Sequence, residues 1–156
     1  MTSGAPPVDP DTPRRTGVRV GIDVGSVRVG VALSDPHGIL ATPVATLSRD
    51  PAGTDLDALA ALIVENEVVE IVVGLPRTLR GTDGAAVTAA RDYASALAQR
   101  VAAVPMVFVD ERLTSVTANR VLADRGMNSR ARRPVVDQLA AVAILQSRLD
   151  ALAATR

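Results

Sequence analysis

Cysteine and lysine are absent from this chain of 156 residues, and His37 is its one histidine. Without cysteine the chain has no disulfide, no thiol nucleophile and no thiolate zinc site. Without lysine it has neither a Walker-type phosphate-binding lysine nor a Schiff-base nucleophile. A metal centre built from several histidines is excluded as well. Any metal ion that the protein binds is therefore a hard, oxygen-ligated ion such as Mg²⁺ or Mn²⁺.

Aromatic residues and long apolar runs are scarce too. Tyr93 and Phe108 are the aromatic residues, too few for the base-stacking platform of an RNA-recognition module. The N-terminus has no apolar signal core, and no apolar run approaches the roughly 20 residues that a membrane span needs. We therefore expect a cytoplasmic protein that does not contact a membrane. Residues 1–16 hold four of the ten prolines, which predicts a disordered leader ahead of a single domain over 17–156.

Charge is balanced in total but uneven along the chain. Seventeen acidic residues face seventeen basic ones, all of them arginines. Residues 35–70 carry seven acids and one Arg, a net charge of −6, whereas residues 112–133 carry six Arg and one Asp, a net charge of +5. This unevenness is either scatter over a solvated surface or a basic strip beside a functional site.

Hydrophobic periodicity predicts a hairpin unit followed by alternating helices and strands, which is typical of one α/β layer domain. Pro43 suggests that the third strand is an edge strand or is broken, and Pro134 suggests the start of the last helix. The expected strands are 18–24, 27–33, 39–47, 68–75 and 105–110. The expected helices are 54–66, 85–103, 114 to about 125 and 135–152, with a basic loop at 130–133.

The first hairpin contains a charged residue at an unusual place. Gly25-Ser26 reads as a two-residue type II′ loop, which would place Asp23 opposite Arg28 across the strands. In the plain structural interpretation the two form a cross-strand ion pair. In the functional interpretation the carboxylate of Asp23 faces a cleft.

Two further acidic positions follow later in the chain. Asp110 and Glu111 end an apolar strand, where α/β sheets form ligand crevices, although an ordinary polar strand end explains them as well. Asp137 is expected in the first turn of the last helix, where it would complement the helix dipole. Carboxylates from three separate elements are what divalent-metal phosphodiester chemistry needs. The spacing does not show that they converge.

Other polar residues give weaker signals. Asp35 follows the second strand as a turn residue or an accessory acid, and His37 is a turn residue. Arg77 and Arg80 lie in a Gly-rich loop that could cradle phosphate, as a flexible loop also would. Arg112 is a local charge partner or a phosphate ligand. The arginines before Asp137 suit bidentate contacts to phosphodiester oxygens; they are Arg130, Arg132 and Arg133.

Four segments occur together in a characteristic order: GIDVGSVRVGVALSD (21–35), IVVGLPRTLRGTDG (71–84), VFVDERLTS (107–115) and DQLAAVAIL (137–145). They resemble the YqgF (RuvX) family of Holliday-junction resolvases and pre-16S rRNA nucleases, from about Val18 to Leu152. The resemblance implies an α/β fold of the RNase H-like kind. Such a fold has a mixed five-stranded sheet, with its first three strands antiparallel, flanked by helices.

The resemblance also implies roles for single residues. Asp23 matches the first-strand metal ligand, Glu111 the acid of the DER motif and Asp137 the acid of the final helix, while Arg28 and Arg112 are the matching arginines. The related RuvC resolvases place two acids three residues apart on the last helix. Here those positions are Pro134 and Ala140, so a fourth carboxylate would have to come from Asp110 or Asp35.

The leading hypothesis is a hydrolase of ester bonds: an Mg²⁺- or Mn²⁺-dependent nuclease that cuts structured nucleic acid, with precursor 16S rRNA as its expected substrate. One alternative is a Holliday-junction resolvase, which would act as a homodimer on a symmetric junction. Another is a nucleic-acid-binding module without catalysis. Because phosphate contacts carry no substrate identity, the sequence leaves this choice open.

Overall fold

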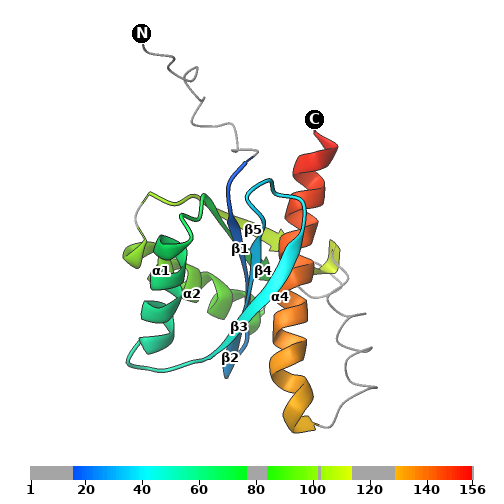
Figure 1. Ribbon diagram of the computed structural model, residues 1–156. Coiled ribbons are helices and arrows are strands. Elements are labelled where there is room, and N and C mark those ends of the chain that lie inside the picture. The colour runs from blue at the N-terminus through cyan, green and yellow to red at the C-terminus, as the bar shows by residue number, and fades with distance from the viewer. Residues whose placement is uncertain (1–15, 77–83, 102, 114–128, 156) are drawn as a thin grey trace.

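The computed structural model describes residues 16–76, 84–101, 103–113 and 129–155 (Figure 1). All of the expected leader except residue 16 lies outside this part. The helix expected from 114 to about 125 lies wholly outside it. The described elements are β1 Arg19–Val24, β2 Arg28–Ser34, β3 Ala41–Ser48, α1 Thr54–Glu65, β4 Glu70–Leu75, α2 Ala85–Arg100, β5 Met106–Asp110, a 3-10 turn Glu111–Leu113 and α4 Ser129–Ala154. In these segments no helix is long and apolar enough to cross a membrane.

The five strands form one mixed sheet in the order β3-β2-β1-β4-β5. β1 pairs antiparallel with β2, and β2 pairs antiparallel with β3. β4 runs parallel to β1, and β5 runs parallel to β4. The predicted hairpin unit, with parallel strands after it, is confirmed.

Different helices cover the two faces of this sheet (Figure 1). Val20 and Ile22 of β1 belong to a buried cluster with α1 and α2 on one face. Val72 of β4 packs with α4 on the other face. Because side chains alternate along a strand, Gly21 and Asp23 of β1 face α4.

Three neighbouring strands each place a glycine beneath α4. They are Gly30 of β2, Gly21 of β1 and Gly74 of β4. A Cβ on Gly21 would lie 2.6 Å from Cβ of Leu145, and a Cβ on either of the others would also come closer to α4 than 3.0 Å, a separation that real Cβ atoms essentially never show. The helix therefore packs directly on the backbone of the central strands.

The first hairpin differs from its prediction by a shift in register. Val24 pairs with Val29, and Asp23 pairs with Gly30 rather than Arg28. The N–H of Gly25 donates to the carbonyl of Arg28 at 2.9 Å, so Ser26 and Val27 form the tip. Gly25 has no positive φ, which a type II′ turn would require at that position. Its lack of a side chain serves a close approach instead, since a Cβ there would lie 2.7 Å from the Arg28 carbonyl.

The two outer strands also bear on the predictions. β3 is at one edge of the sheet, and the register shifts between Val31 and Ala32, opposite Pro43, as its proline suggested. β5 is at the other edge and is only partly buried, with Phe108 38% exposed. This apolar strand is not fully buried, because an edge strand has a neighbour on one side only.

The last helix begins earlier than predicted. α4 starts at Ser129, so residues 130–133 are helical rather than a loop, and Pro134 lies inside the second turn. A proline lacks one N–H but has a φ that suits a helix, so it can be accommodated when the helix is held by packing elsewhere. Asp137 is consequently the ninth residue of α4 and not a first-turn residue. Complementing the helix dipole does not explain its presence, because that effect falls off within the first turn.

Candidate active site

Asp23 lies at the carboxyl end of β1 between two glycines. Its neighbour on β2 is Gly30. On the other side, Ile22 pairs with Val73 of the parallel strand β4, so the next residue, Gly74, lies beside Asp23. Asp23 is buried, with 4% of its surface exposed, and faces α4. The two missing side chains leave the α4 face open for acids from other elements on both sides of it.

Asp137 occupies the position above the first glycine. Its backbone carbonyl lies where a Cβ on Gly30 would be, and this contact fixes the start of the packed part of α4 against β2. The Oδ2 atom of Asp137 accepts a hydrogen bond from Nε of Arg28 at 3.1 Å. The side chain of Asp137 is 19% exposed, and that of Arg28 is 28% exposed. Arg28 thus joins the hairpin to Asp137 of α4.

Glu111 occupies the position above the second glycine. It follows β5 directly, as the first residue of the 3-10 turn. Its Oε1 atom lies 2.8 Å from the place where a Cβ on Gly74 would be, beside Ile144 of α4. A side chain at position 74 would therefore displace both this carboxylate and the side chain of Ile144.

The three candidate acids consequently reach the same face of the sheet at the same end. Adjacent strands lie about 4.8 Å apart, so the two glycines that flank Asp23 are separated by roughly twice that spacing. In the described segments, no group of three or more His, Asp or Glu side chains is arranged to hold a metal ion. The structure brings the three acids to the same end of the sheet without arranging them as a complete set of metal ligands. One oxygen of Asp137 accepts a hydrogen bond from Arg28.

Asp110 points away from this cluster. It pairs in register with Leu75 of β4, which belongs to the cluster on the α2 side of the sheet. Its carboxylate accepts hydrogen bonds from the backbone N–H of Arg112 at 2.9 Å and from the guanidinium of the same residue. This carboxylate raises the pKa of Arg112 above its ordinary value. Asp110 is therefore placed as the partner of Arg112 and not as a fourth acid beside Asp23.

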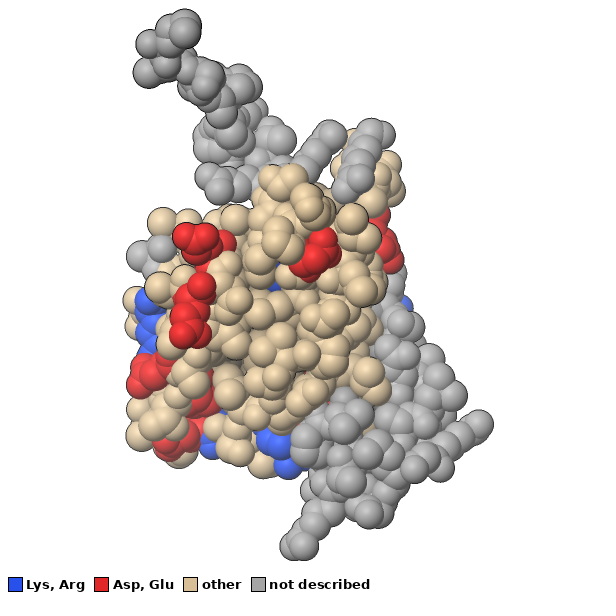
Figure 2. Space-filling view, viewed as in Figure 1, with Lys and Arg blue, Asp and Glu red and all other residues tan. Residues whose placement is uncertain are grey.

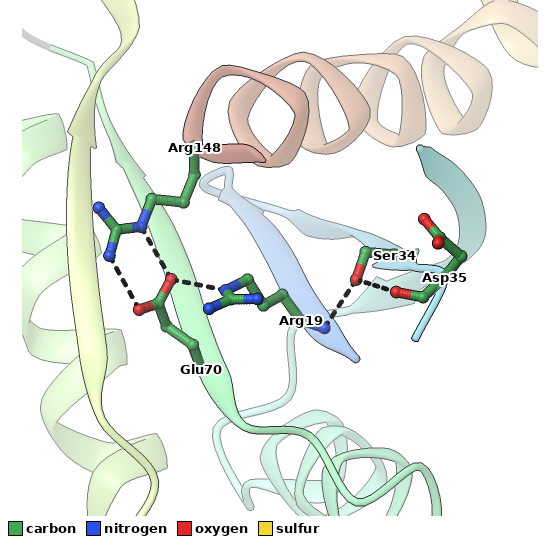
Figure 3. A network of polar contacts seen from close by, with 5 residues as sticks. All are labelled: Arg19, Ser34, Asp35, Glu70 and Arg148. Atoms are coloured by element: carbon green, nitrogen blue, oxygen red, sulfur yellow. Dashed lines mark hydrogen bonds and ion pairs between the residues drawn. The ribbon is translucent and has the colours of Figure 1, made fainter. Parts of the chain in front are cut away.

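Asp35 lies at the opposite end of the sheet. It follows Ser34, whose hydroxyl accepts a hydrogen bond from the backbone N–H of Arg19 at the start of β1 (Figure 3). Its carboxylate accepts hydrogen bonds from the backbone N–H groups of His37, Ile39 and Leu40 at 2.7–3.0 Å. Asp35 therefore organises a turn, as one of its two interpretations proposed, and His37 is part of that turn.

The turn acid provides a test by pH. The hydrogen bond from the N–H of Leu40, with those of Ile39 and His37, lowers the pKa of Asp35 below its ordinary value of 3.8. A carboxyl whose pKa is lowered by folding stabilises the fold at pH values above its ordinary pKa. This contribution is lost as the pH falls through the folded-state pKa. We expect a carboxyl titration by NMR to give Asp35 a midpoint below 3.8, and Asp35→Asn to flatten the dependence of Tm on pH below 3.8. A midpoint at or above 3.8 would contradict this arrangement of the turn.

The basic candidates are placed only in part. Arg77 and Arg80 lie outside the described residues. The backbone of residues 130–133 forms the first turns of α4, while the side chains of Arg130, Arg132 and Arg133 lie outside the description. The positions of many acidic residues can be described. Figure 2 shows acidic side chains, drawn in red, gathered at the α1 side of the molecule. That side is across the sheet from α4 (Figure 1).

Gly30 and Gly74 shape the candidate site, and the sequence analysis did not single them out. Both stand inside otherwise apolar strands, and a glycine within a strand often marks a close approach of another backbone or a ligand. That signal was present in VRVGVAL and IVVGLP. It did not say which element approaches.

Comparisons with known proteins agree with this architecture. A family model described as "RuvX: Holliday junction resolvase" matches residues 17–151. A protein of Frankia casuarinae named "Putative pre-16S rRNA nuclease" is 60% identical over 134 residues, which cover 85% of this chain and 66% of that protein. A protein of Mycolicibacterium paratuberculosis with the same name is 54% identical over 144 residues, which cover 92% and 86% of the two chains.

A solved structure supports the fold. The structure of T. thermophilus RuvC in complex with a Holliday junction substrate matches with a TM-score of 0.57 at 18% identity, over 89% of this chain and 97% of that one. At this identity the likeness concerns the fold, which is RNase H-like. The family match covers most of the chain and agrees with the order of the four sequence segments. The chain belongs to the RuvX family.

Proposed function

We propose that this protein is a metal-dependent nuclease that hydrolyses phosphodiester bonds in structured nucleic acid, with precursor 16S rRNA as its substrate. One observation carries the proposal. Asp23 is buried between Gly30 and Gly74, and α4 and the 3-10 turn bring Asp137 and Glu111 over those same two glycines. An ordinary structural role for the three acids does not require glycine on both sides of the central one.

The chemistry of the donors fits a divalent ion. Asp23, Glu111 and Asp137 are carboxylates, the ligands that Mg²⁺ and Mn²⁺ prefer. When bound, such an ion lowers the pKa of a coordinated water and stabilises negative charge on the phosphate. Arg28 uses Oδ2 of Asp137, and a carboxylate has a second oxygen that can serve an ion. The role of Arg28 is thus to hold the carboxylate of Asp137 turned toward β2.

The arginines supply the contacts to the nucleic-acid backbone in this proposal. Residues 130–133 precede Asp137 on the same helix by four to seven positions, which is about 6–10 Å along its axis. A strip of arginines at this distance suits phosphates on either side of the bond to be cut. We assign Arg28, Arg77, Arg80, Arg112, Arg130, Arg132 and Arg133 to this surface.

Holliday-junction resolution is a second candidate, favoured by the description of the family model. It would require a homodimer that presents two sites to a symmetric junction. The choice of precursor rRNA rests on the names that the relatives of Frankia and Mycolicibacterium carry. A binding module without catalysis is a third candidate, against which the presence of all three acids argues.

The test compares two substrates under matched conditions. We expect the purified protein to cut a 5′-extended precursor of 16S rRNA in Mg²⁺ or Mn²⁺, to stop when EDTA is added, and to leave a four-way DNA junction uncut. Symmetric cuts in the junction with no cleavage of the RNA would favour resolution instead. Salt-dependent binding of RNA with no cleavage in either metal would favour the binding module.

A further inference from the structure

Arg28 places a positive charge beside the three candidate acids. It stands on β2 two residues before Gly30, and residues two apart on a strand face the same side of the sheet. Its side chain therefore projects toward α4 at the end of the sheet where Asp23 lies. There Nε of Arg28 donates to Oδ2 of Asp137 at 3.1 Å. Because arginine stays charged at any ordinary pH, this carboxylate is paired with a permanent cation.

Other contacts fix the backbone of Asp137. Its carbonyl packs on Gly30 of β2. The next residue of α4, Gln138, donates from Nε2 to Oγ1 of Thr46 on β3 at 3.0 Å. The bond from Arg28 reaches only the carboxylate of Asp137. Arg28 therefore acts on the charge and direction of this carboxylate, whereas the helix is held by its own packing.

The far end of α4 is anchored separately. Arg148 donates from Nε to Oε1 of Glu70 at 2.8 Å and from a terminal nitrogen to Oε2 at 3.0 Å. Nε of Arg19, at the start of β1, donates to Oε1 of the same carboxylate at 3.2 Å. Figure 3 shows the two arginines converging on Glu70 at the start of β4. We therefore expect α4 to keep its place on the sheet when Arg28 is replaced.

A guanidinium and a divalent cation compete for a carboxylate. The positive charge of Arg28 repels any cation that approaches Asp137, and Arg28 already uses Oδ2. A phosphate of a nucleic-acid backbone offers Arg28 another partner, which the planar guanidinium binds well. The side chain of Arg28 is partly exposed, so a phosphate can reach it. Once it is paired with phosphate, Arg28 opposes a metal ion far less.

We propose that Arg28 couples metal binding to nucleic-acid binding. Without nucleic acid it pairs with Asp137 and keeps the affinity for Mg²⁺ or Mn²⁺ low. When the substrate arrives it turns to a backbone phosphate and leaves the carboxylate to the ion. This inference rests on the proposed function and adds an order of binding to it. By linkage, the metal ion and the nucleic acid then strengthen each other's binding by the same factor.

The first test titrates the protein with Mn²⁺ in the absence of nucleic acid and follows free Mn²⁺ by electron paramagnetic resonance. Groups that contact a metal ligand from outside typically change metal affinity by about 10–100-fold. We expect Arg28→Gln to bind Mn²⁺ at least about 10-fold more tightly than the wild type, because the competing charge is gone. Arg28→Lys keeps the charge and should bind as the wild type does. Arg100→Gln is the matched control, since Nε of Arg100 also bonds a carboxylate, that of Asp57.

The second test looks for the phosphate contact in EDTA, where no cleavage is expected. Arg28→Gln should lower the slope of log K against log[salt] for binding of the precursor RNA by about 0.7–1, and Arg100→Gln should not. In the wild type, the Nε–H resonance of Arg28 should shift when this RNA is added. This NMR measurement decides the question even if Arg28→Gln does not fold.

The outcomes separate this inference from the proposed function. Equal or weaker Mn²⁺ binding by Arg28→Gln would show that Arg28 only orients Asp137, and would overturn the inference while the nuclease proposal stands. An unchanged Nε–H resonance or salt slope would overturn it in the same way. If neither the wild type nor Arg28→Gln binds Mn²⁺, the inference and the metal-dependent nuclease fall together.

Discussion

Asp23→Asn lowers the rate of phosphodiester cleavage by at least about 10³-fold in our expectation, while the protein stays folded. The carboxylate is buried on the face shared with Glu111 and Asp137. Loss of a metal ligand removes several kcal/mol of transition-state stabilisation, and each 1.36 kcal/mol corresponds to a factor of ten in rate. Asparagine preserves the size of the side chain, so Tm should change by only a few degrees. Single-turnover cleavage and thermal unfolding measure the two effects.

A matched substitution separates chemistry from general damage. Glu111→Gln should behave like Asp23→Asn, because its carboxylate lies over Gly74 at the same edge. Asp35→Asn makes the same chemical change at the opposite end of the sheet and should cleave at the wild-type rate. Full activity in both Asp23→Asn and Glu111→Gln would remove the proposed mechanism. Equal loss in Asp35→Asn would show that the assay reports folding rather than catalysis.

Gly30→Ala is expected to damage stability and activity together. The added Cβ would lie well within 3.0 Å of the carbonyl carbon and oxygen of Asp137, and backbone cannot move aside as the tip of a side chain can. Overpacking of this kind costs about 1–3 kcal/mol, which corresponds to a fall in Tm of about 3–10 °C for a chain of this size. Because α4 carries Asp137, a shift of about 1 Å should lower cleavage by roughly 10²-fold.

The control for this change is another glycine. Gly84 precedes α2 with an extended backbone, and nothing lies within 4 Å of the place where its Cβ would be. Gly84→Ala should therefore change Tm by less than about 2 °C. A Gly30→Ala protein with wild-type Tm and activity would contradict the close packing of α4 on β2.

Much of the fold could be predicted because its signals are local. The alternation of Val20 and Ile22 with Gly21 and Asp23 predicted β1, and the apolar run at 68–75 predicted the strand that becomes β4. The predicted hairpin register was wrong, because Asp23 pairs with Gly30 and not with Arg28, two residues earlier. The error arose because a glycine such as Gly25 has two possible roles. It can begin a tight turn, and it can also permit the close approach to Arg28 that the structure uses.

The candidate site was predictable in composition but not in assembly. The acids could be named from spacing and resemblance, whereas their placement over Gly30 and Gly74 depends on how α4 crosses the sheet. The start of α4 was misplaced because Pro134 is a strong local signal for a first turn, and packing far along the helix outweighs it. The contact of Arg28 with Asp137 could not be predicted by a local rule, because the two residues are 109 positions apart in sequence.

The length of α4 has a consequence for which changes the family can accept. One unbroken helix carries Asp137 at one point and Arg148 eleven residues later, about 16 Å along its axis. A residue inserted between them would turn one end by roughly 100° relative to the other, so either the acid or the arginine would leave the sheet. We therefore expect insertions to be tolerated in the connecting loops but not between Asp137 and Arg148. The number of residues in this stretch sets the distance and the relative rotation of the two side chains at opposite ends of the sheet.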